Sequence, residues 1–354
     1  MFRALMQWPV VAGLLSLAIV GAWPLAAPAA EEGGLGHGMV NPGYHEQPDW
    51  FKLSFLDLRD DVREATAARK RVLLYFYQDG CPYCKKLLED NFGQRAIAEK
   101  TRKHFDVIAI NMWGSREVTG LDGVTTSEKD FAAKMRVMFT PTLLFLNEQG
   151  KVALRVNGYY FPEKFNAALD YVAGHMETKL RFHDYLAKVA PEKSKGVLHQ
   201  EPGYIQAPYD LRAKARGTGK YLMVLFEQKH CKSCDELHED ILKRPRSREQ
   251  LKKLDVALLD MWADTPVTTP DGKRTTAAHW ARTLDVKYAP TMVFFDADGK
   301  EVFRAEAYLK AFHVQGSMAY ATSGAYRTQP NFQRFLQGRR AELEKQGVKV
   351  DLWQ

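Results

Sequence analysis

Two short cysteine motifs constrain this chain more than any other feature of its sequence. One is C-P-Y-C at 81–84, the other is C-K-S-C at 231–234, and together they contain all four cysteines. Each motif follows an apolar run that predicts a buried strand, and each precedes a helical pattern. Two thiols three residues apart at the start of a helix can form and break a disulfide with little backbone movement. The motifs therefore predict thiol–disulfide exchange at two places in the chain.

The two motifs belong to a longer internal repeat, in which matching residues lie about 150 positions apart. The clearest further matches are Glu89-Asp90 with Glu239-Asp240, Trp113 with Trp262, Thr140-Pro141 with Ala289-Pro290, and Gly150-Lys151 with Gly299-Lys300. Such self-similarity indicates two domains of one fold. We expect these domains at 50–188 and 206–345, joined by a linker at 189–205 with Pro and Gly breakers and followed by a tail at 346–354.

The first copy of the repeat alternates strand patterns with helix patterns. Residues 72–77 form a continuous apolar run, which is typical of a central strand covered on both faces. The other expected elements are helices at 81–91, 96–104, 127–135 and 162–172, a strand at 106–111, and a hairpin of 142–147 with 152–157. The second copy repeats this order. The pattern predicts an α/β fold of two tandem domains, each a central mixed sheet flanked by helices.

The N-terminus predicts export. Arg3 precedes an apolar core at 10–20, and small residues at 27–29 offer a cleavage site. We therefore expect a signal peptide at 1–29, a flexible arm at 30–49 and a mature chain in the periplasm. The alternative is an uncleaved membrane anchor, but the apolar run is short for a bilayer span. No stable membrane insertion is expected after cleavage.

The net charge of +7 is spread along the chain in short runs. Such runs are typical of solvated helix faces, and they show no basic stripe of the kind that binds nucleic acid. No nucleic-acid partner is therefore expected.

The position of each cysteine predicts its role in exchange. Cys81 and Cys231 stand at helix starts, where free N–H groups and the helix dipole stabilise a thiolate, so each is assigned as the attacking thiol. Cys84 and Cys234 follow one turn later on the same face and can resolve a mixed disulfide. The first position of a helix that follows a strand is exposed at a sheet edge, so we expect exposed attacking cysteines rather than inert buried ones. The alternatives are a zinc site shared by the two pairs and a copper-handling dithiol.

These residues resemble the thioredoxin superfamily over nearly the whole mature chain. The resemblance lies in the order of strand, C-x-x-C, helix, Thr-Pro-Thr or Ala-Pro-Thr and Gly-Lys hairpin, found twice. It implies that Pro141 and Pro290 are cis and pack beside the cysteine pairs. It also implies that Thr140 and Ala289 hold substrate backbone in the manner of an added strand. No cofactor is implied beyond the redox-active disulfides Cys81–Cys84 and Cys231–Cys234.

A narrower resemblance is to exported thioredoxin-like proteins of bacterial sulfur-oxidation gene clusters. These proteins share the long segment before the proline, here 113–134 and 262–282, and we expect turns at 122–123 and 271–272 to form its tips. One departure concerns a buried acid that thioredoxins carry six residues before the first cysteine. Tyr75 and Leu225 occupy those positions, so the resemblance does not extend to fast general reductase activity.

The surroundings of the two attacking cysteines differ. His230 and Lys232 flank Cys231 and favour its thiolate, whereas Asp79 lies two residues before Cys81. A stabilised thiolate makes a pair more oxidising. We therefore predict that His230 and Lys232 tune the second pair to the higher reduction potential, so that electrons pass from the first pair to the second.

The whole pattern predicts an exported thiol–disulfide oxidoreductase that reduces protein disulfides through two active sites. Its expected partners are disulfide-bearing exported proteins and a membrane thiol electron donor, because an oxidising compartment supplies no reductant of its own. The alternatives are a disulfide isomerase or oxidase, and a copper- or zinc-binding dithiol module.

Overall fold

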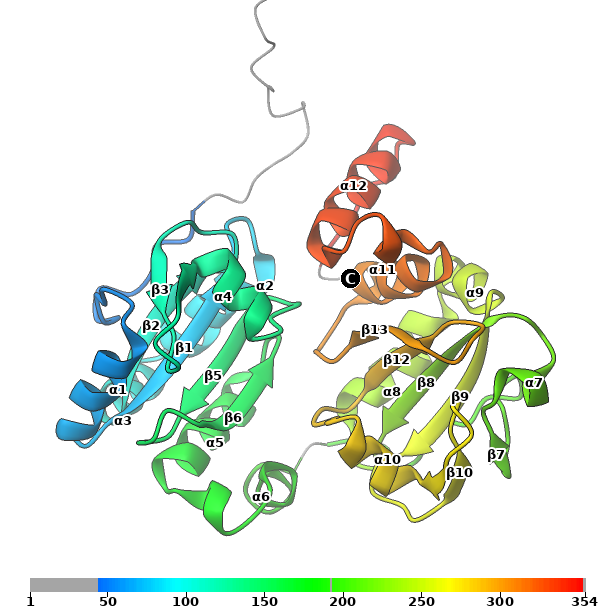
Figure 1. Ribbon diagram of the computed structural model, residues 1–354, viewed down its shortest axis with the longest axis horizontal. Coiled ribbons are helices and arrows are strands. Elements are labelled where there is room, and N and C mark those ends of the chain that lie inside the picture. The colour runs from blue at the N-terminus through cyan, green and yellow to red at the C-terminus, as the bar shows by residue number, and fades with distance from the viewer. Residues whose placement is uncertain (1–43, 192, 353–354) are drawn as a thin grey trace, which may run out of the picture. The chain divides into compact units, whose positions relative to one another are not determined.

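The computed structural model describes residues 44–191 and 193–352, and it contains the expected pair of α/β domains (Figure 1). The predicted signal peptide and most of the predicted arm lie outside the described residues. Within the described ranges, no helix combines the length and the apolar character that a bilayer span requires.

The first domain contains a four-stranded sheet, a small hairpin and flanking helices. In chain order its elements are α1 (Leu58–Ala67), β1 (Arg71–Tyr77), α2 (Pro82–Lys86), a π-helical turn η1 (Leu87–Phe92), α3 (Arg95–His104), β2 (Phe105–Asn111), β3 (Glu117–Thr119), β4 (Thr125–Ser127), α4 (Glu128–Lys134), β5 (Thr142–Leu146), β6 (Val152–Asn157), α5 (Pro162–Ala173), the 3-10 turn η2 (Met176–Thr178) and α6 (Phe182–Val189).

The second domain repeats this order. Its elements are β7 (Tyr209–Asp210), α7 (Ala213–Arg216), β8 (Tyr221–Glu227), α8 (Lys232–Glu239), the 3-10 turn η3 (Ile241–Lys243), α9 (Pro245–Leu251), β9 (Leu254–Asp260), β10 (Pro266–Thr268), β11 (Arg274–Thr276), α10 (Ala277–Thr283), β12 (Thr291–Phe295), β13 (Glu301–Ala305), α11 (Ala311–Thr322), the 3-10 turn η4 (Ala325–Arg327) and α12 (Phe332–Lys345).

Both large sheets are mixed, as the sequence predicts, and their strand orders correspond: β2-β1-β5-β6 in the first domain and β9-β8-β12-β13 in the second. The central strands β1 and β8 pair in parallel with β2 and β9, and antiparallel with β5 and β12. The parallel pair needs a crossover, which α2 and α3 supply in the first domain and α8 and α9 supply in the second. In each domain the central strand therefore leads directly into the turn that carries the cysteine pair.

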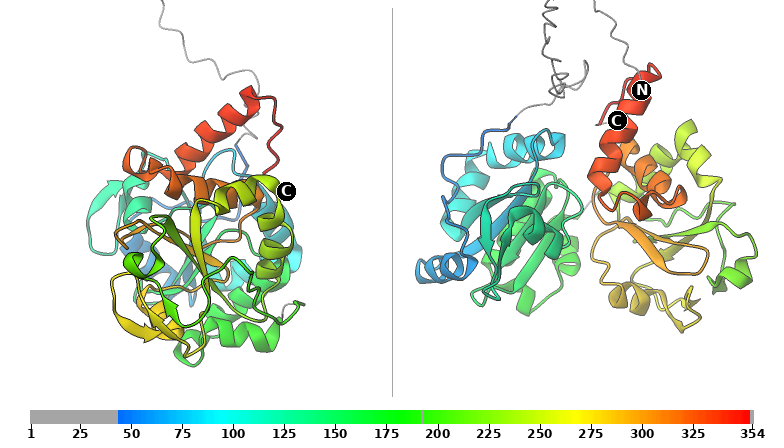
Figure 2. Two further views of the ribbon diagram at one scale, coloured as in Figure 1. Left: turned by 90° about the vertical axis from the view of Figure 1, so that its right-hand side faces the viewer. Right: turned by 45° about the horizontal axis from the view of Figure 1, so that its top comes forward.

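Helices cover both faces of each sheet, which explains the continuous apolar runs of the central strands (Figure 2). In β1, Leu73 and Tyr75 pack with α3 and α5, while Leu74 and Phe76 pack with α1 and α4. The second domain has the same two layers. The odd-numbered residues of β8 face α8 and α11, and the even-numbered residues face α10.

The long segment before each proline forms a hairpin, β3–β4 in the first domain and β10–β11 in the second. The turns between their strands contain Gly123 and Gly272, which both have positive φ, 77° and 85°. Glycine adopts this backbone region without steric cost. The expected turn tips therefore lie where the sequence placed them. Sequence analysis did not identify α1, which begins at an Asp57 N-cap.

A buried arginine ties the start of β1 to the end of α5 in the first domain. The Arg71 guanidinium donates to both carboxylate oxygens of Glu148, at 2.8 and 3.0 Å, and to the carbonyl of Val172 at 2.7 Å. It also pairs with Glu177 at 2.8 Å. The hydrogen bond from Arg71 holds the pKa of Glu148 well below its usual range, at about 2. The second domain begins β8 with Tyr221 instead.

Candidate active sites

The first cysteine of each pair caps the helix that follows the central strand. Cys81 precedes α2, and its Sγ accepts a hydrogen bond from the backbone N–H of Cys84 at 3.0 Å. Cys231 precedes α8 and accepts the corresponding bond from Cys234 at 3.1 Å. A sulfur at an N-cap receives an N–H that the helix leaves free, and the helix dipole favours negative charge there. This geometry stabilises a thiolate on Cys81 and on Cys231.

Each pair forms a disulfide, with 5.2 Å between the two Cα atoms in both cases. The expectation that the attacking cysteines are exposed is wrong for this oxidised form. Cys81 is 3% exposed and Cys231 is 2% exposed. In the first site, Thr140 of the segment that carries the proline lies against Cys81. A substrate sulfur therefore needs local opening to reach either disulfide.

Both prolines of the repeat follow cis peptide bonds, Thr140–Pro141 and Ala289–Pro290. In the first site the segment lies against the attacking cysteine: the Thr140 hydroxyl donates to Cys81 Sγ at 3.3 Å. The Thr140 carbonyl lies 3.4 Å from the same sulfur, a contact only, since a disulfide sulfur has no proton to donate. Ala289 has no hydroxyl, so the second site lacks this bond. The roles of these four residues in substrate binding stay predictions.

The hydroxyl of Thr140 is expected to make the first pair more oxidising, because a hydrogen bond to a thiolate stabilises the reduced form. Replacing Thr140 by Val should lower the reduction potential of the first pair by about 30 mV, equivalent to about 1.4 kcal/mol for one charge-assisted bond. The measurement is equilibration with glutathione in a protein whose second pair is replaced by Ala.

The second site supplies the matched control for this prediction. Ala289→Thr, in a protein without the first pair, should raise the potential of the second pair. Unchanged potentials in both variants would contradict the role that we assign to the hydroxyl.

A glutamine and a tryptophan meet beside each cysteine pair. The indole N–H of Trp113 donates to Gln78 Oε1 at 2.7 Å, and Trp262 donates to Gln228 Oε1 at 3.0 Å. Each glutamine lies three residues before the attacking cysteine, in the turn that follows the central strand. The repeat matches Trp113 with Trp262, but their glutamine partners were not predicted from the sequence. The signal was present, since Gln78 and Gln228 correspond in the repeat.

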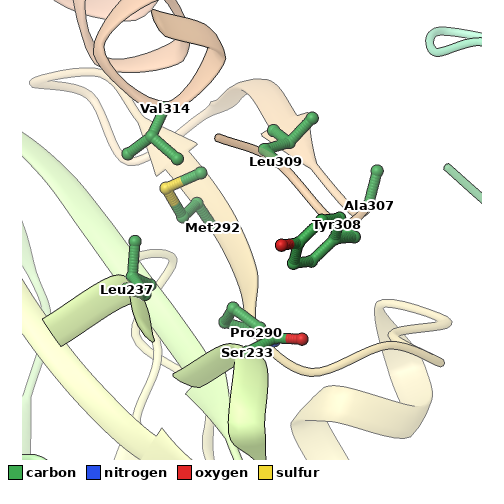
Figure 3. Close-up of a pocket in the computed structure, with 8 residues that line it drawn as sticks. All are labelled: Ser233, Leu237, Pro290, Met292, Ala307, Tyr308, Leu309 and Val314. Atoms are coloured by element: carbon green, nitrogen blue, oxygen red, sulfur yellow. The ribbon is translucent and has the colours of Figure 1, made fainter. Parts of the chain in front are cut away.

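An apolar pocket lies beside the second pair (Figure 3). Ser233, between the two cysteines, and the cis proline Pro290 lie at one side of it, and Met292 and Val314 lie further in. The ring of Tyr308 borders the pocket, and its hydroxyl donates to Glu236 at 2.9 Å.

The residues predicted to tune the second pair flank it on the surface. His230 and Lys232 are both exposed, and the His230 ring lies next to the backbone of Gly196. The predicted order of reduction potentials depends on these two residues, and it stays a prediction. The Thr140 hydroxyl acts in the opposite direction, because it favours the thiolate of the first pair.

Comparison with known proteins gives one family. The model of the thioredoxin-like domain matches twice, at residues 58–173 and 210–322. The two matches cover more than half of the chain and correspond to the two domains of the repeat. A comparison with curated proteins gives no match.

Solved structures with similar folds cover about one domain of this chain. A thioredoxin-fold protein from Helicobacter pylori is 24% identical, covering 34% of this chain and 79% of its own, with a TM-score of 0.31. A thioredoxin from Thermus thermophilus is 22% identical, covering 33% of this chain and 83% of its own, with a TM-score of 0.27. The oxidised C-terminal domain of DsbD from Neisseria meningitidis is 17% identical, covering 32% of this chain and 90% of its own, with a TM-score of 0.25.

Proposed function

This chain belongs to the thioredoxin-like domain family in both halves, and from that premise we propose that it is a thiol–disulfide oxidoreductase that reduces disulfides of other proteins. The observation that carries this proposal is the repeated site: a disulfide at the start of a helix, with its first sulfur at the N-cap and a cis proline in the same domain. Such a sulfur is a good leaving group and a good nucleophile near neutral pH.

The proposed exchange proceeds in two steps at each site. The thiolate of Cys81 or Cys231 attacks a substrate disulfide and forms a mixed disulfide. Cys84 or Cys234 then attacks the cysteine sulfur, which releases the reduced substrate and re-forms the intradomain disulfide. The protein leaves this cycle oxidised, so turnover requires an electron donor, for which we propose a membrane thiol protein.

The direction of exchange and the compartment belong to the same proposal. The apolar segment at 10–20 supports export to the periplasm, where disulfides form readily and a dedicated reductant has a purpose. The long hairpin segments at 113–134 and 262–282 support a role similar to that of the exported proteins of sulfur-oxidation gene clusters. The substrates would then be exported proteins that carry a disulfide.

Reduction of insulin tests the proposed activity. The full chain, reduced beforehand and freed of reductant, should cleave insulin disulfides with a yield of two electrons per cysteine pair, and a variant with all four cysteines replaced by Ala should not. Faster oxidation of reduced ribonuclease than reduction of insulin would instead favour an oxidase or isomerase. Copper or zinc retained at one ion per reduced pair, without insulin reduction, would favour a metal-binding module.

A further inference from the structure

A buried carboxylate and a buried imidazole lie together in the second domain, between its sheet and the helix of the cysteine pair. Glu227 Oε1 and His238 Nε2 are 2.8 Å apart, and neither side chain is more than 1% exposed. Glu227 ends β8, and strand alternation places it on the face of Leu225, which α8 covers. His238 follows Cys234 by four residues, so the two share one face of α8. The Glu227–His238 pair thus lies one helical turn from the resolving cysteine.

The fold itself does not require this pair. The first domain has Tyr77 and Leu88 at the corresponding positions, both packed in its apolar cluster, and builds the same sheet. A buried ion pair rarely adds stability over apolar residues of similar volume, because both charges lose their hydration. The second domain therefore carries a costly feature that its sister domain omits.

Two atoms of the pair are left unpartnered. Among the residues that the structure describes, neither His238 Nδ1 nor Glu227 Oε2 has a hydrogen-bond partner, although both atoms are buried. If Glu227 is ionised, the 2.8 Å contact requires the proton of neutral His238 to lie on Nε2. Nδ1 then carries a free lone pair. A proton taken up there would be stabilised by the adjacent carboxylate.

Other titratable groups surround the pair from three directions. On α8 they are Asp235 and Cys234, with Cys231 at its N-cap. Asp260 lies at the end of β9, and His199 and Tyr204 lie in the segment before β7. The His199 ring stacks on His238 with centroids 4.9 Å apart, and its Nε2 lies 2.7 Å from Asp235. His199 is 12% exposed at its side chain, so it connects the buried pair with solvent. Burial raises the pKa of Tyr204, which stays neutral.

We propose that His238, positioned by Glu227, accepts the proton of the Cys234 thiol when Cys234 resolves a mixed disulfide at Cys231. Cβ atoms at this helical spacing are roughly 5–6 Å apart, a span that one buried water can bridge to the unpartnered Nδ1. The positions differ from the acid six residues before the first cysteine that the superfamily uses, because Leu225 occupies that place.

The step balances without a further reactant, and it rests on the exchange proposed above. The Cys234 thiol gives its proton to His238 Nδ1, and the thiolate attacks Cys231 Sγ. The Cys231–Cys234 bond forms while the bond from Cys231 to the substrate sulfur breaks. The substrate leaves as a thiolate, reduced by two electrons overall, and the proton on His238 later returns to solvent past His199.

The test follows resolution of a mixed disulfide directly, with dithiobis-nitrobenzoate as the probe. The protein is the full chain with Cys81→Ala and Cys84→Ala, reduced and mixed with one equivalent of probe. The first thionitrobenzoate reports attack by Cys231, and the second reports resolution by Cys234. Because His238 itself remains, Glu227→Gln should slow the second release by up to about 100-fold near neutral pH, the lower end of what a positioned base contributes. The difference should shrink as the pH is raised above about 8.5, the ordinary pKa of a cysteine, because the thiol then ionises increasingly without a base.

Two further variants keep the test decisive. Glu227→Tyr/His238→Leu installs the residues of the first domain and should slow the second release in the same way, even if Glu227→Gln folds poorly. Asp255→Asn removes a partly buried carboxylate at the far end of the same sheet, where it pairs with Arg216, and should change neither release.

The outcomes separate this inference from the proposed function. Equal second-release rates in folded variants, or slowing by one factor at every pH, would overturn the role of His238 while insulin reduction by the full chain persists. A chain that fails to reduce insulin but shows the pH-dependent slowing would refute the proposed function and support the proton transfer.

Discussion

Replacing Cys81 and Cys231 together by Ser is expected to reduce insulin reduction by about a thousandfold or more, to the uncatalysed rate. A serine hydroxyl does not ionise near neutral pH, so it cannot attack a disulfide, and each resolving cysteine lies inside the helix, beyond the N-cap position that stabilises a thiolate. Residues that act as one unit lose nearly all activity when one is removed. The measurement is the initial rate of insulin reduction, with folding checked by circular dichroism.

Replacing the two resolving cysteines should instead trap the substrate on the protein in the same experiment. Cys84→Ser/Cys234→Ser should keep the first attack and lose the second, so that mixed disulfides with insulin accumulate on Cys81 and Cys231. Mass spectrometry of the trapped protein should find one adduct per domain. Retained multiple turnover in this variant would show that Cys84 and Cys234 are not needed for resolution, and it would contradict the assigned roles.

Replacing Arg71 by Met is expected to destabilise the first domain by about 3 kcal/mol, the usual cost of leaving buried charges without a partner. The Arg71 side chain is only 5% exposed, and its removal deprives Glu148, Glu177 and the Val172 carbonyl of their donor. Hydrogen exchange should show the loss in β1 and not in β8, because the two strands belong to separate sheets.

A matched surface arginine isolates the effect of burial. Arg63 is 70% exposed and pairs with Asp60 within α1, so Arg63→Met should cost less than about 1 kcal/mol. Arg71→Met/Glu148→Gln should be less destabilised than the two single changes predict by addition, since the carboxylate no longer needs a partner. If Arg71→Met lost no more stability than Arg63→Met, the result would contradict the structural role of the Arg71 network.

Local patterns in the sequence were sufficient to predict most elements of each domain. The strand at 72–77 and the helix at 162–172 lie within β1 and α5, because apolar periodicity follows directly from which faces are covered. The α1 helix was missed, although its Asp57 N-cap and the buried Leu58 and Val62 are typical of a helix start. A short amphipathic helix before a strong strand signal is easily assigned to a loop.

In the candidate sites, a smaller part of the arrangement was predicted from the sequence. The strand position at which thioredoxins carry a buried acid is Leu225 in the second domain, yet Glu227 provides a buried acid two residues later. Strand alternation puts both positions on the face below α8, so an acid at either position can reach the helix. A glutamate at the end of an apolar strand, together with a histidine four residues after Cys234, was the available signal.

By itself the sequence determined the spacing of the cysteines, the repeat and the order of strands and helices, because these depend on neighbours along the chain. Only the tertiary structure decided which distant side chains meet. Thr140 touches Cys81 from 59 residues away, and Trp113 reaches Gln78 from 35 residues away. Such contacts depend on strand order and helix packing, which bring together side chains whose proximity no periodicity encodes. The same packing makes the two sites unequal. In the first site the Thr140 hydroxyl donates a hydrogen bond to Cys81, and in the second a buried pair of Glu227 and His238 lies near the disulfide.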